Sequence, residues 1–294
     1  MRVALIGCVK MSAGILTAIS TVTETTIVGV VTRSASPLNS DFCDLSTVAN
    51  DIGAPVLSLE QHDAVKMCQW LIQQQPDLIF CAGWSYLLPK SLIDFPPMGV
   101  VGFHPAKLPQ NRGRHPLIWT LALGLKETAS TFFLMDEGAD SGDIISQVPL
   151  IIPEAMKAGE LYDLVSQTAQ TQAIDIVQSA ATGSLTYVAQ DHSQANIWRK
   201  RSKLDGEIDW RMSAETIANL VRALGTPYPG AHCVQDAKDA KIWHATSVEK
   251  NVPANIEPGR VLEIREKSLL VKCGVGAVWL IEHELTIPKV GSVL

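Results

Sequence analysis

The sequence lacks any apolar run that approaches about 18 residues, and it lacks the paired cysteines of common metal sites. The missing run argues against a membrane-spanning helix. The amino terminus, MRVALIGCVKMSAGI, has no long apolar segment followed by a small-residue cleavage site, so we expect no secretory signal peptide. The chain should therefore be cytoplasmic, with no membrane partner.

The six cysteines are dispersed, without a C-x-x-C pair and without histidines at metal-ligand spacing. This pattern disfavours both a disulfide framework and a zinc site. We expect most of them to be small buried apolar residues of a reducing compartment. The cysteines are Cys8, Cys43, Cys68, Cys81, Cys233 and Cys273.

Positive charge is also in short supply. The 24 Lys and Arg against 30 Asp and Glu give a formal net charge of −6. Affinity for nucleic acid rests on many contacts between cations and phosphates, so an acidic chain is a poor candidate for that role. With 47% apolar and 18% charged residues the chain can bury a sizeable core. Its 294 residues suit two domains, or one large one, at roughly 100–200 residues per domain.

The first half of the chain alternates strand-like runs with helix-like runs. Such alternation predicts βαβ units and a mostly parallel sheet. Ligands of these sheets bind beyond the carboxyl ends of the strands, so we expect chemistry in the loops after Phe80, Phe103 and Met135. The expected strands are residues 3–6, 27–31, 77–80, 99–103 and 130–135, with helices from residue 12 and over 63–74.

The second half begins with a long amphipathic pattern over residues 159–181, which predicts a packing helix. A further helix is expected over 214–224, and the chain is β-rich after residue 230. We therefore predict an α/β fold, with a Rossmann-like mostly parallel sheet in residues 1–200 and a small β-barrel-like (OB-like) domain in 201–294. The expected strands of that domain are 241–243, 259–262, 269–273 and 278–281.

His104 is the first candidate catalytic residue. A predicted strand delivers it into a loop that contains three prolines, and proline stiffens a loop because its ring fixes φ. A histidine at the opening of a sheet suits a general acid or base. A surface loop with a hydrogen-bonded histidine is the alternative interpretation. The nearby cations that could attract an anionic substrate are Lys107, Arg112 and Arg114.

A second segment, MDEGADSGD at residues 135–143, holds four acids and two glycines after a predicted strand. A carboxylate beside His104 would hold its tautomer and stabilise its protonated form. The glycines would permit a ligand to approach the backbone closely. An acidic turn or a Mg²⁺ loop would account for the same residues.

Taken together these segments resemble the folate-dependent formyltransferases, and the resemblance covers almost the whole chain. Two further motifs are similar to the start of the carboxyl-terminal domain shared by methionyl-tRNA formyltransferase and amino-sugar formyltransferases. The four motifs are HPxxLPxxRGR at 104–114, ADSG at 139–142, RKRS and DGEIDW at 199–210, and VRA with PYPGA at 221–231. Their order and spacing identify the family more strongly than any one of them.

The resemblance implies a Rossmann-like domain followed by a small open β-barrel, with N10-formyltetrahydrofolate as formyl donor, an amine as nucleophile and no metal. By position it makes His104 and Asp140 the catalytic pair and Arg114 the substrate-side cation. The residues that it assigns to the pterin of the folate are Tyr86, Leu87 and Leu88, with Asp136, Glu137, Gly138, Ala139 and Asp140.

One position departs from the family pattern. Family members usually carry Asn-x-His, where the asparagine helps to bind the formyl oxygen, and this chain has Gly102 there. Loss of an oxyanion donor can cost about 2.7–4 kcal/mol in the transition state. Three alternatives follow: Asn111 supplies the donor, protonated His104 suffices with a water or a backbone N–H, or the chain binds substrate and turns over poorly.

Three hypotheses remain for what this chain does with the formyl group. We favour an amino sugar, linked to a nucleotide and used in bacterial surface glycans, over the initiator tRNA of methionyl-tRNA formyltransferase. Residues 32–44, where the tRNA enzyme is expected to carry a long basic insertion, hold one Arg and two Asp. The third class is a folate- or sugar-binding relative with weak or no activity, or a hydrolase that uses water. Association into a homo-oligomer stays open.

Overall fold

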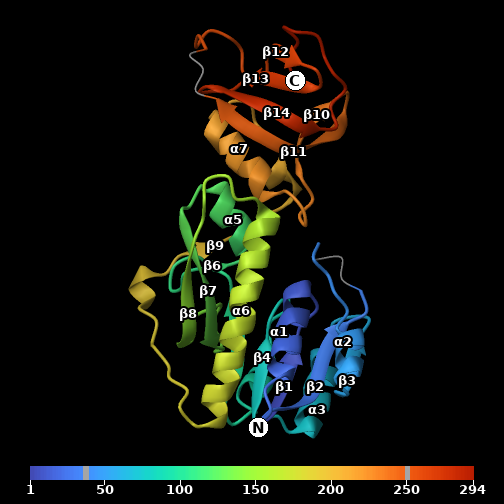
Figure 1. Ribbon diagram of the computed structural model, residues 1–294, viewed down its shortest axis with the longest axis vertical. Coiled ribbons are helices and arrows are strands. Elements are labelled where there is room, and N and C mark those ends of the chain that lie inside the picture. The colour runs from blue at the N-terminus through green and yellow to red at the C-terminus, as the bar shows by residue number, and fades with distance from the viewer. Residues whose placement is uncertain (36–39, 249–251) are drawn as a thin grey trace. The chain divides into compact units, whose positions relative to one another are not determined.

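The computed structural model describes residues 1–35, 40–248 and 252–294, and these form two compact units (Figure 1). Residues 36–39 of the segment compared above with the tRNA enzymes lie outside the described residues. The first unit consists of Met1–Pro116, Glu127–Ile151 and Asp163–Trp198. The second consists of Leu117–Lys126, Ile152–Tyr162 and Arg199–Leu294. The domain ranges 1–200 and 201–294 stay a prediction.

The first unit is built on a sheet that has seven strands in the described residues, in the order β3-β2-β1-β4-β5-β7-β8. The neighbours from β3 to β5 pair in parallel, and β7 and β8 add antiparallel strands at one side. The predicted Rossmann-like, mostly parallel sheet is therefore confirmed. The strands are β1 Arg2–Ile6, β2 Thr26–Arg33, β3 Val56–Leu59, β4 Leu78–Cys81, β5 Val100–His104, β7 Glu127–Leu134 and β8 Ile144–Ile151.

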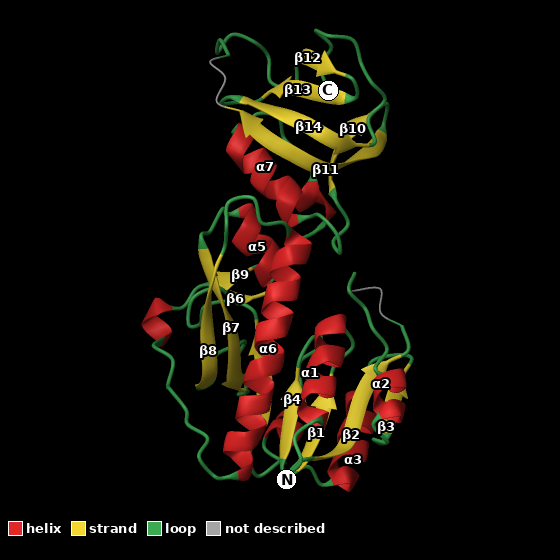
Figure 2. Cartoon of the chain, viewed as in Figure 1, coloured by secondary structure: helices red, strands yellow, loops and turns green. Residues whose placement is uncertain are grey.

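Helices follow the strands as the alternation predicts (Figure 2). The longest, α6 (Ala158–Ala181), buries the apolar stripe that its sequence repeats every three or four residues, including Leu161, Val165 and Ala173. The start of α3 is capped by Asp63, whose carboxylate accepts from the Lys66 amide. The helices that precede α6 in the described residues are α1 Lys10–Ser20, α2 Ser46–Asp51, α3 Ala64–Gln74, α4 Lys90–Ile93 and α5 Pro116–Ala122.

Two strands of this sheet were not predicted. β3 is only four residues long, and β8 contains Pro149, which argues against a central strand. Among the strands of the described residues β8 pairs with β7 alone, apart from a single bridge from Ile144 to Val188, so it is an edge strand, where a proline is tolerated.

The expected place of the loop after Met135 was wrong in one respect. We expected this loop at the carboxyl edge of the sheet, but β7 runs antiparallel to β5 and Leu134 pairs with Val101, near the start of β5. The loop must therefore fold back along β5 to bring its acidic residues to the end of that strand. Asp140 completes this path, as its contacts with His104 show below.

The second unit carries a five-stranded antiparallel sheet in the order β10-β11-β14-β13-β12, with α7 packed on β11 and β14. Ser213 caps α7 (Ala214–Ala223) by accepting from the Thr216 amide. This agrees with the predicted small β domain, although β10 was not predicted and β11 is much longer than expected. The strands are β10 Ala231–Gln235, β11 Lys238–Val248, β12 Val261–Arg265, β13 Ser268–Lys272 and β14 Ala277–His283.

Several short elements belong to neither of these sheets. The strands β6 (Arg112–Gly113) and β9 (Ile197–Trp198) form a two-stranded parallel ribbon. Two 3₁₀ turns, η1 (His192–Gln194) and η2 (Lys203–Gly206), flank β9. No helix in the described ranges is both long and apolar enough to cross a membrane. The six cysteines are free thiols and all but Cys43 are buried, as predicted for most of them.

Candidate active site

His104 is the last residue of β5 and is only 4% exposed. Its Nε2 lies 2.7 Å from the carbonyl oxygen of Asn111. Because a carbonyl only accepts hydrogen bonds, this contact assigns the ring proton to Nε2. The neutral ring then carries its lone pair on Nδ1, which is the atom that can take up a proton.

Asp140 faces that second nitrogen. Its Oδ2 lies 3.6 Å from His104 Nδ1, and the same oxygen accepts a hydrogen bond of 2.8 Å from the Gly113 amide. Asp140 has a φ of +53°, a left-handed conformation that aspartate tolerates better than most residues. The structure thus brings together the two residues that the resemblance pairs, with the carboxylate placed to stabilise a proton on Nδ1.

Asn111 serves this site through its backbone. Its carbonyl accepts from His104 Nε2, and its amide donates to Asn196 Oδ1 at 2.8 Å. The residue has a φ of +63°, in the left-handed region where asparagine is favoured over most side chains. The proposal that its side-chain amide binds the formyl oxygen stays a prediction.

Gly102 is crowded by side chains from β7 and from the residue just after it. Its φ lies outside the left-handed region, so the backbone itself would accept another residue. A Cβ at this position would lie 2.7 Å from Phe133 Cζ and 2.9 Å from Met135 Cγ. The space that the family's asparagine side chain would need is therefore taken by an aromatic ring and a thioether.

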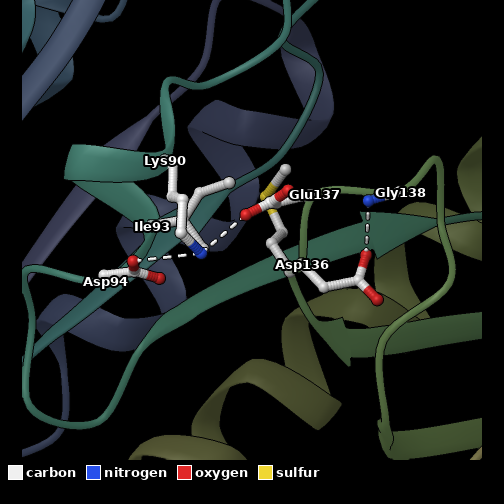
Figure 3. Close-up of a pocket in the computed structure, with 7 residues that line it drawn as sticks. Lys90, Ile93, Asp94, Asp136, Glu137 and Gly138 are labelled. Atoms are coloured by element: carbon white, nitrogen blue, oxygen red, sulfur yellow. Dashed lines mark hydrogen bonds and ion pairs between the residues drawn. The ribbon is translucent and has the colours of Figure 1, made fainter.

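A cavity of about 400 Å³ lies beside α4, within the roughly 300–1,000 Å³ usual for ligand sites. Lys90 reaches across it to Glu137 (2.6 Å) and to Asp94 (3.3 Å), as Figure 3 shows. These carboxylates, Glu137 first, raise the pKa of the Lys90 ammonium. Asp136 turns back to accept from the Gly138 amide and the Ser141 hydroxyl. The lining residues are Lys90, Ile93, Asp94, Met135, Asp136, Glu137 and Gly138.

The residues predicted to contact the pterin divide into two groups. Asp136, Glu137 and Gly138 line the cavity, whereas the predicted 86–88 loop, Ala139 and Asp140 are not among its lining residues. Tyr86 instead points at Arg33, whose Nη1 donates to its hydroxyl at 2.7 Å, and stacks on His62 with ring centroids 4.0 Å apart. Sequence reasoning missed Lys90, Ile93 and Asp94.

The neighbouring loop residues have distinct positions. Leu88 is buried, Leu87 is 82% exposed, and Ala139 is exposed on its turn. The buried Leu88 anchors the loop, so it is Leu87 that projects from it. Their assignment to the folate stays a prediction.

The three cations near His104 have different partners. Lys107 forms an ion pair with Glu127 at 2.7 Å. Arg112 is buried and donates through Nε and Nη2 to Gln190 Oε1. Arg114 is exposed and donates only weakly, at 3.4 Å, to a backbone carbonyl. Arg114 is thus the cation of this loop best placed to meet an anionic ligand.

Within the described ranges, no group of three or more His, Cys, Asp or Glu side chains is placed to hold a metal ion. The contacts of the site are instead hydrogen bonds and one His–Asp pair, together with a carboxylate-lined cavity. This arrangement can bind a polar heterocycle, move a proton at Nδ1 and attract an anion.

Comparisons with known proteins identify the family. Residues 1–177 match the family model described as formyl transferase, and residues 200–289 match the formyl transferase C-terminal domain. A methionyl-tRNA formyltransferase of Syntrophus aciditrophicus is 37% identical over 205 residues, which cover 70% of this chain and 65% of that protein. The methionyl-tRNA formyltransferase of Clostridium novyi is 33% identical over 214 residues, 73% of this chain and 68% of that one. The match thus spans about two thirds of these relatives' length.

Solved structures of sugar enzymes share the fold. An N-formyltransferase from Helicobacter canadensis, in complex with folinic acid and dTDP-3-aminofucose, has a TM-score of 0.72 at 16% identity, over 95% of this chain and 98% of that one. A sugar 3N-formyl transferase solved with dTDP and 5-N-formyl-THF has a TM-score of 0.71 at 15% identity, over 98% and 99% of the two chains. The predicted family and two-part fold are confirmed: the chain belongs to the formyl transferase family.

Proposed function

We propose that this protein transfers a formyl group from N10-formyltetrahydrofolate to the amine of a nucleotide-linked amino sugar. In this reaction the amine nitrogen forms a bond to the formyl carbon, and the bond from that carbon to N10 of the folate breaks. One proton leaves the amine and one is delivered to N10. The chain must therefore move a proton, stabilise the tetrahedral carbon's oxyanion and hold both substrates.

His104 handles the proton. Its Nε2–H is committed to the Asn111 carbonyl, so the proton enters and leaves at Nδ1. Asp140 Oδ2, 3.6 Å from that nitrogen, stabilises the imidazolium that forms when the amine is deprotonated. The imidazolium then acts as the acid that protonates N10. Gly102 provides no side-chain donor, so stabilisation of the oxyanion falls to the charged His104, to Asn111, or to water.

The fit of the folate rests on the cavity at Asp136, Glu137 and Gly138. A pterin carries ring N–H groups and an amino group, which carboxylates and backbone carbonyls accept well. Glu137 is paired with Lys90 in this structure. Because both side chains are exposed, this ion pair is weak, and the carboxylate becomes available to a heterocycle when the pair opens.

The amino-sugar assignment rests on one observation: basic side chains that could bind phosphates are already paired with carboxylates. In the 199–203 cluster Arg199 pairs with Asp205, and Lys203 pairs with Asp239 at 2.5 Å. A tRNA-binding surface needs many cations free for phosphates, since each contact contributes to affinity. Paired cations leave Arg114 as a cation suited to a single diphosphate.

Transfer to initiator methionyl-tRNA is the second candidate, because the curated relatives at 30–37% identity carry that name. The test is a panel of UDP-, GDP-, CMP- and dTDP-linked amino sugars beside methionyl-tRNA, with N10-formyltetrahydrofolate as donor. Tetrahydrofolate release and the mass of the formylated product are measured. Formylation of the tRNA alone would reject the sugar assignment, and release without a formylated amine would indicate a hydrolase.

A matched pair of variants sharpens this test. Arg114→Gln should raise KM for the nucleotide sugar at least several-fold, whereas Lys107→Gln, which removes a cation of the same loop that is paired with Glu127, should not. Equal effects of the two substitutions would show that Arg114 has no particular role. Donor KM serves as the internal reference for both variants.

A further inference from the structure

The segment 188–198, which we name the strap, lies between the two matched family regions, 1–177 and 200–289. It has no helical or alternating pattern, and its only regular elements are η1 and β9. It is nevertheless bonded to the rest of the first unit at several points along its length. Val188 bridges to Ile144, and β9 pairs with β6 beside Gly113. Two of its side chains, those of Asn196 and Gln190, contact the segment after His104 and the loop of Asp140.

Asn196 contacts the His104 side of the site. Its Oδ1 accepts from the Asn111 amide at 2.8 Å, and its backbone carbonyl accepts from the Arg112 amide at 3.1 Å. These bonds hold the left-handed Asn111 peptide from its amide end. The Asn111 carbonyl accepts the hydrogen bond from His104 Nε2–H. Asn196 therefore fixes the acceptor that determines the tautomer of the histidine.

Gln190 contacts the Asp140 side. It is 6% exposed, and its Nε2 donates to the carbonyls of Asp140 (3.0 Å) and Gly142 (2.6 Å). Its Oε1 accepts from Nε and Nη2 of the buried Arg112. Carbonyls only accept and a guanidinium only donates, so the amide has one permitted orientation. Gln190 thus ties the loop of Asp140, itself left-handed at φ +53°, to the loop of His104.

Gly113 closes the arrangement. Its amide donates to Asp140 Oδ2, and a Cβ at this position would lie 2.3 Å from the Trp198 carbonyl of the strap. With a φ of +105° and the Trp198 carbonyl this close, only glycine fits at this position. The carboxylate of Asp140 is therefore placed by a backbone amide that the strap holds from its other side.

We propose that the strap sets the relative position of His104 and Asp140, with Asn196 and Gln190 as positioning residues. For its kinetic consequence this rests on the proposed function, because the pair matters only if it moves the reaction's proton. Its structural consequence does not depend on activity. Asn196 determines which nitrogen of His104 is protonated, and Gln190 determines how the Asp140 carboxylate faces the other nitrogen of that ring.

Asn196 is tested with two substitutions that separate the role of its side-chain oxygen from that of its side-chain NH₂. Asn196→Asp keeps an oxygen acceptor for the Asn111 amide, whereas Asn196→Ala removes it. We expect Asn196→Ala to lower kcat by roughly 10- to 100-fold, the scale of a catalytic group displaced by about 1 Å, and Asn196→Asp to retain most of it. If both variants lose kcat equally, the side-chain NH₂ is what matters and the acceptor role is wrong.

Gln190→Glu separates stability from positioning. A glutamate keeps the acceptor for Arg112 and adds an ion pair, but it removes both donors to the Asp140 loop and directs a carboxylate at two carbonyls. We expect Tm to be retained while kcat falls and the pH–rate profile shifts. Loss of Tm that accounts for the loss of kcat would make Gln190 a stability residue and overturn its positioning role.

The readout that does not need activity is the ¹⁵N NMR signal of His104. Wild type should show Nε2–H in the neutral ring, and Asn196→Ala should mix the tautomers while Asn196→Asp does not. Gln235→Ala is the matched control, because Gln235 also joins its amide to a distant backbone, at Thr286, but within the second unit. An unchanged tautomer and unchanged kcat in Asn196→Ala and Gln190→Glu would overturn the proposal. An inactive wild type with the expected tautomer shifts would reject the proposed function and leave the positioning intact.

Discussion

Substituting Gly102 by Asn restores the residue type of the family pattern, yet we expect it to damage this protein. The new Cβ would lie 2.7 Å from Phe133 Cζ and 2.9 Å from both Phe133 Cε1 and Met135 Cγ, closer than Cβ contacts occur in proteins. Phe133 is buried on β7, which pairs Phe133 with Gly102 directly, so its ring has little freedom to move. Overpacking of this kind typically costs about 1–3 kcal/mol.

The magnitude can be measured as a melting temperature. One kcal/mol shifts Tm by about 2–4 °C in chains of 150–250 residues, so Gly102→Asn should lower Tm by roughly 2–12 °C. Its kcat should fall as well, because β5 carries His104 two residues further on. Phe133→Leu opens the space, so in a double-mutant cycle Gly102→Asn should cost less beside the smaller leucine side chain than beside the ring, with a coupling of about 0.5–3 kcal/mol.

Urea unfolding of the four proteins gives the coupling, and single-turnover formyl transfer gives the rate. A Gly102→Asn variant with unchanged Tm and a higher kcat would refute the reasoning. It would mean that the ring yields freely and that this chain is a weakened enzyme that lacks one donor. Additivity of the two substitutions within about 0.5 kcal/mol would contradict the contact on which the argument rests.

Three further outcomes are expected. Asp140→Asn keeps the left-handed backbone that asparagine accepts but removes the charge, so kcat should fall at least tenfold with Tm little changed; an unaltered pH–rate profile would count against the pairing with His104. Asn111→Ala should lower kcat, by roughly 1–3 kcal/mol in barrier if a buried hydrogen bond to the formyl oxygen is lost, and a silent variant would assign that oxygen to another donor. Arg199 holds the pKa of Asp205 well below its usual range, so the pair stabilises the fold above roughly pH 4 and this contribution is lost as pH falls through the depressed pKa. The Tm difference between wild type and Asp205→Asn should thus be largest near neutral pH and close in acid; a constant difference would contradict the linkage.

The parts of the fold that sequence reasoning predicted are those with a strong period. The stripe of α6 and the β-rich runs of the parallel strands follow directly from burial of one face. β8 was missed because Pro149 is allowed only by an edge position, which depends on the order of strands in the finished sheet. Edge positions of this kind cannot be read from local sequence.

The site was predicted unevenly for a similar reason. His104 and Asp140 each lie in a recognisable sequence motif, and the structure brings the two residues together. The expected position of the Asp140 loop was nevertheless wrong, since the antiparallel direction of β7 is a property of the sheet. His104 is also more buried than a loop histidine, which means that His104→Ala would leave the Asn111 carbonyl unpaired as well as removing the base.

Glutamine and asparagine side chains such as Gln190 and Asn196 left no sequence signal. Polar amides in an irregular segment are common, and only their partners distinguish them from surface residues. Those partners are 50 and 85 residues away along the chain. A tertiary contact of that span has no local pattern from which to be predicted.

The long span of these contacts has a consequence for how the protein reaches its native state. The strands β1 to β5 all pair within the first 104 residues, but the bonds from the strap to residues 111 and 140 close only after at least 190 residues have been made. Contacts of such high sequence separation form late, because their loop-closure entropy is paid before they stabilise anything. If the strap acts as proposed, a nascent or truncated chain that ends with α6 would hold the sheet while the Asn111 carbonyl and the Asp140 loop lack the bonds that fix them. On the proposed role of the strap, proton-transfer chemistry would appear only after the first sheet has formed, and a fragment that ended before Trp198 would lack part of the arrangement that supports it.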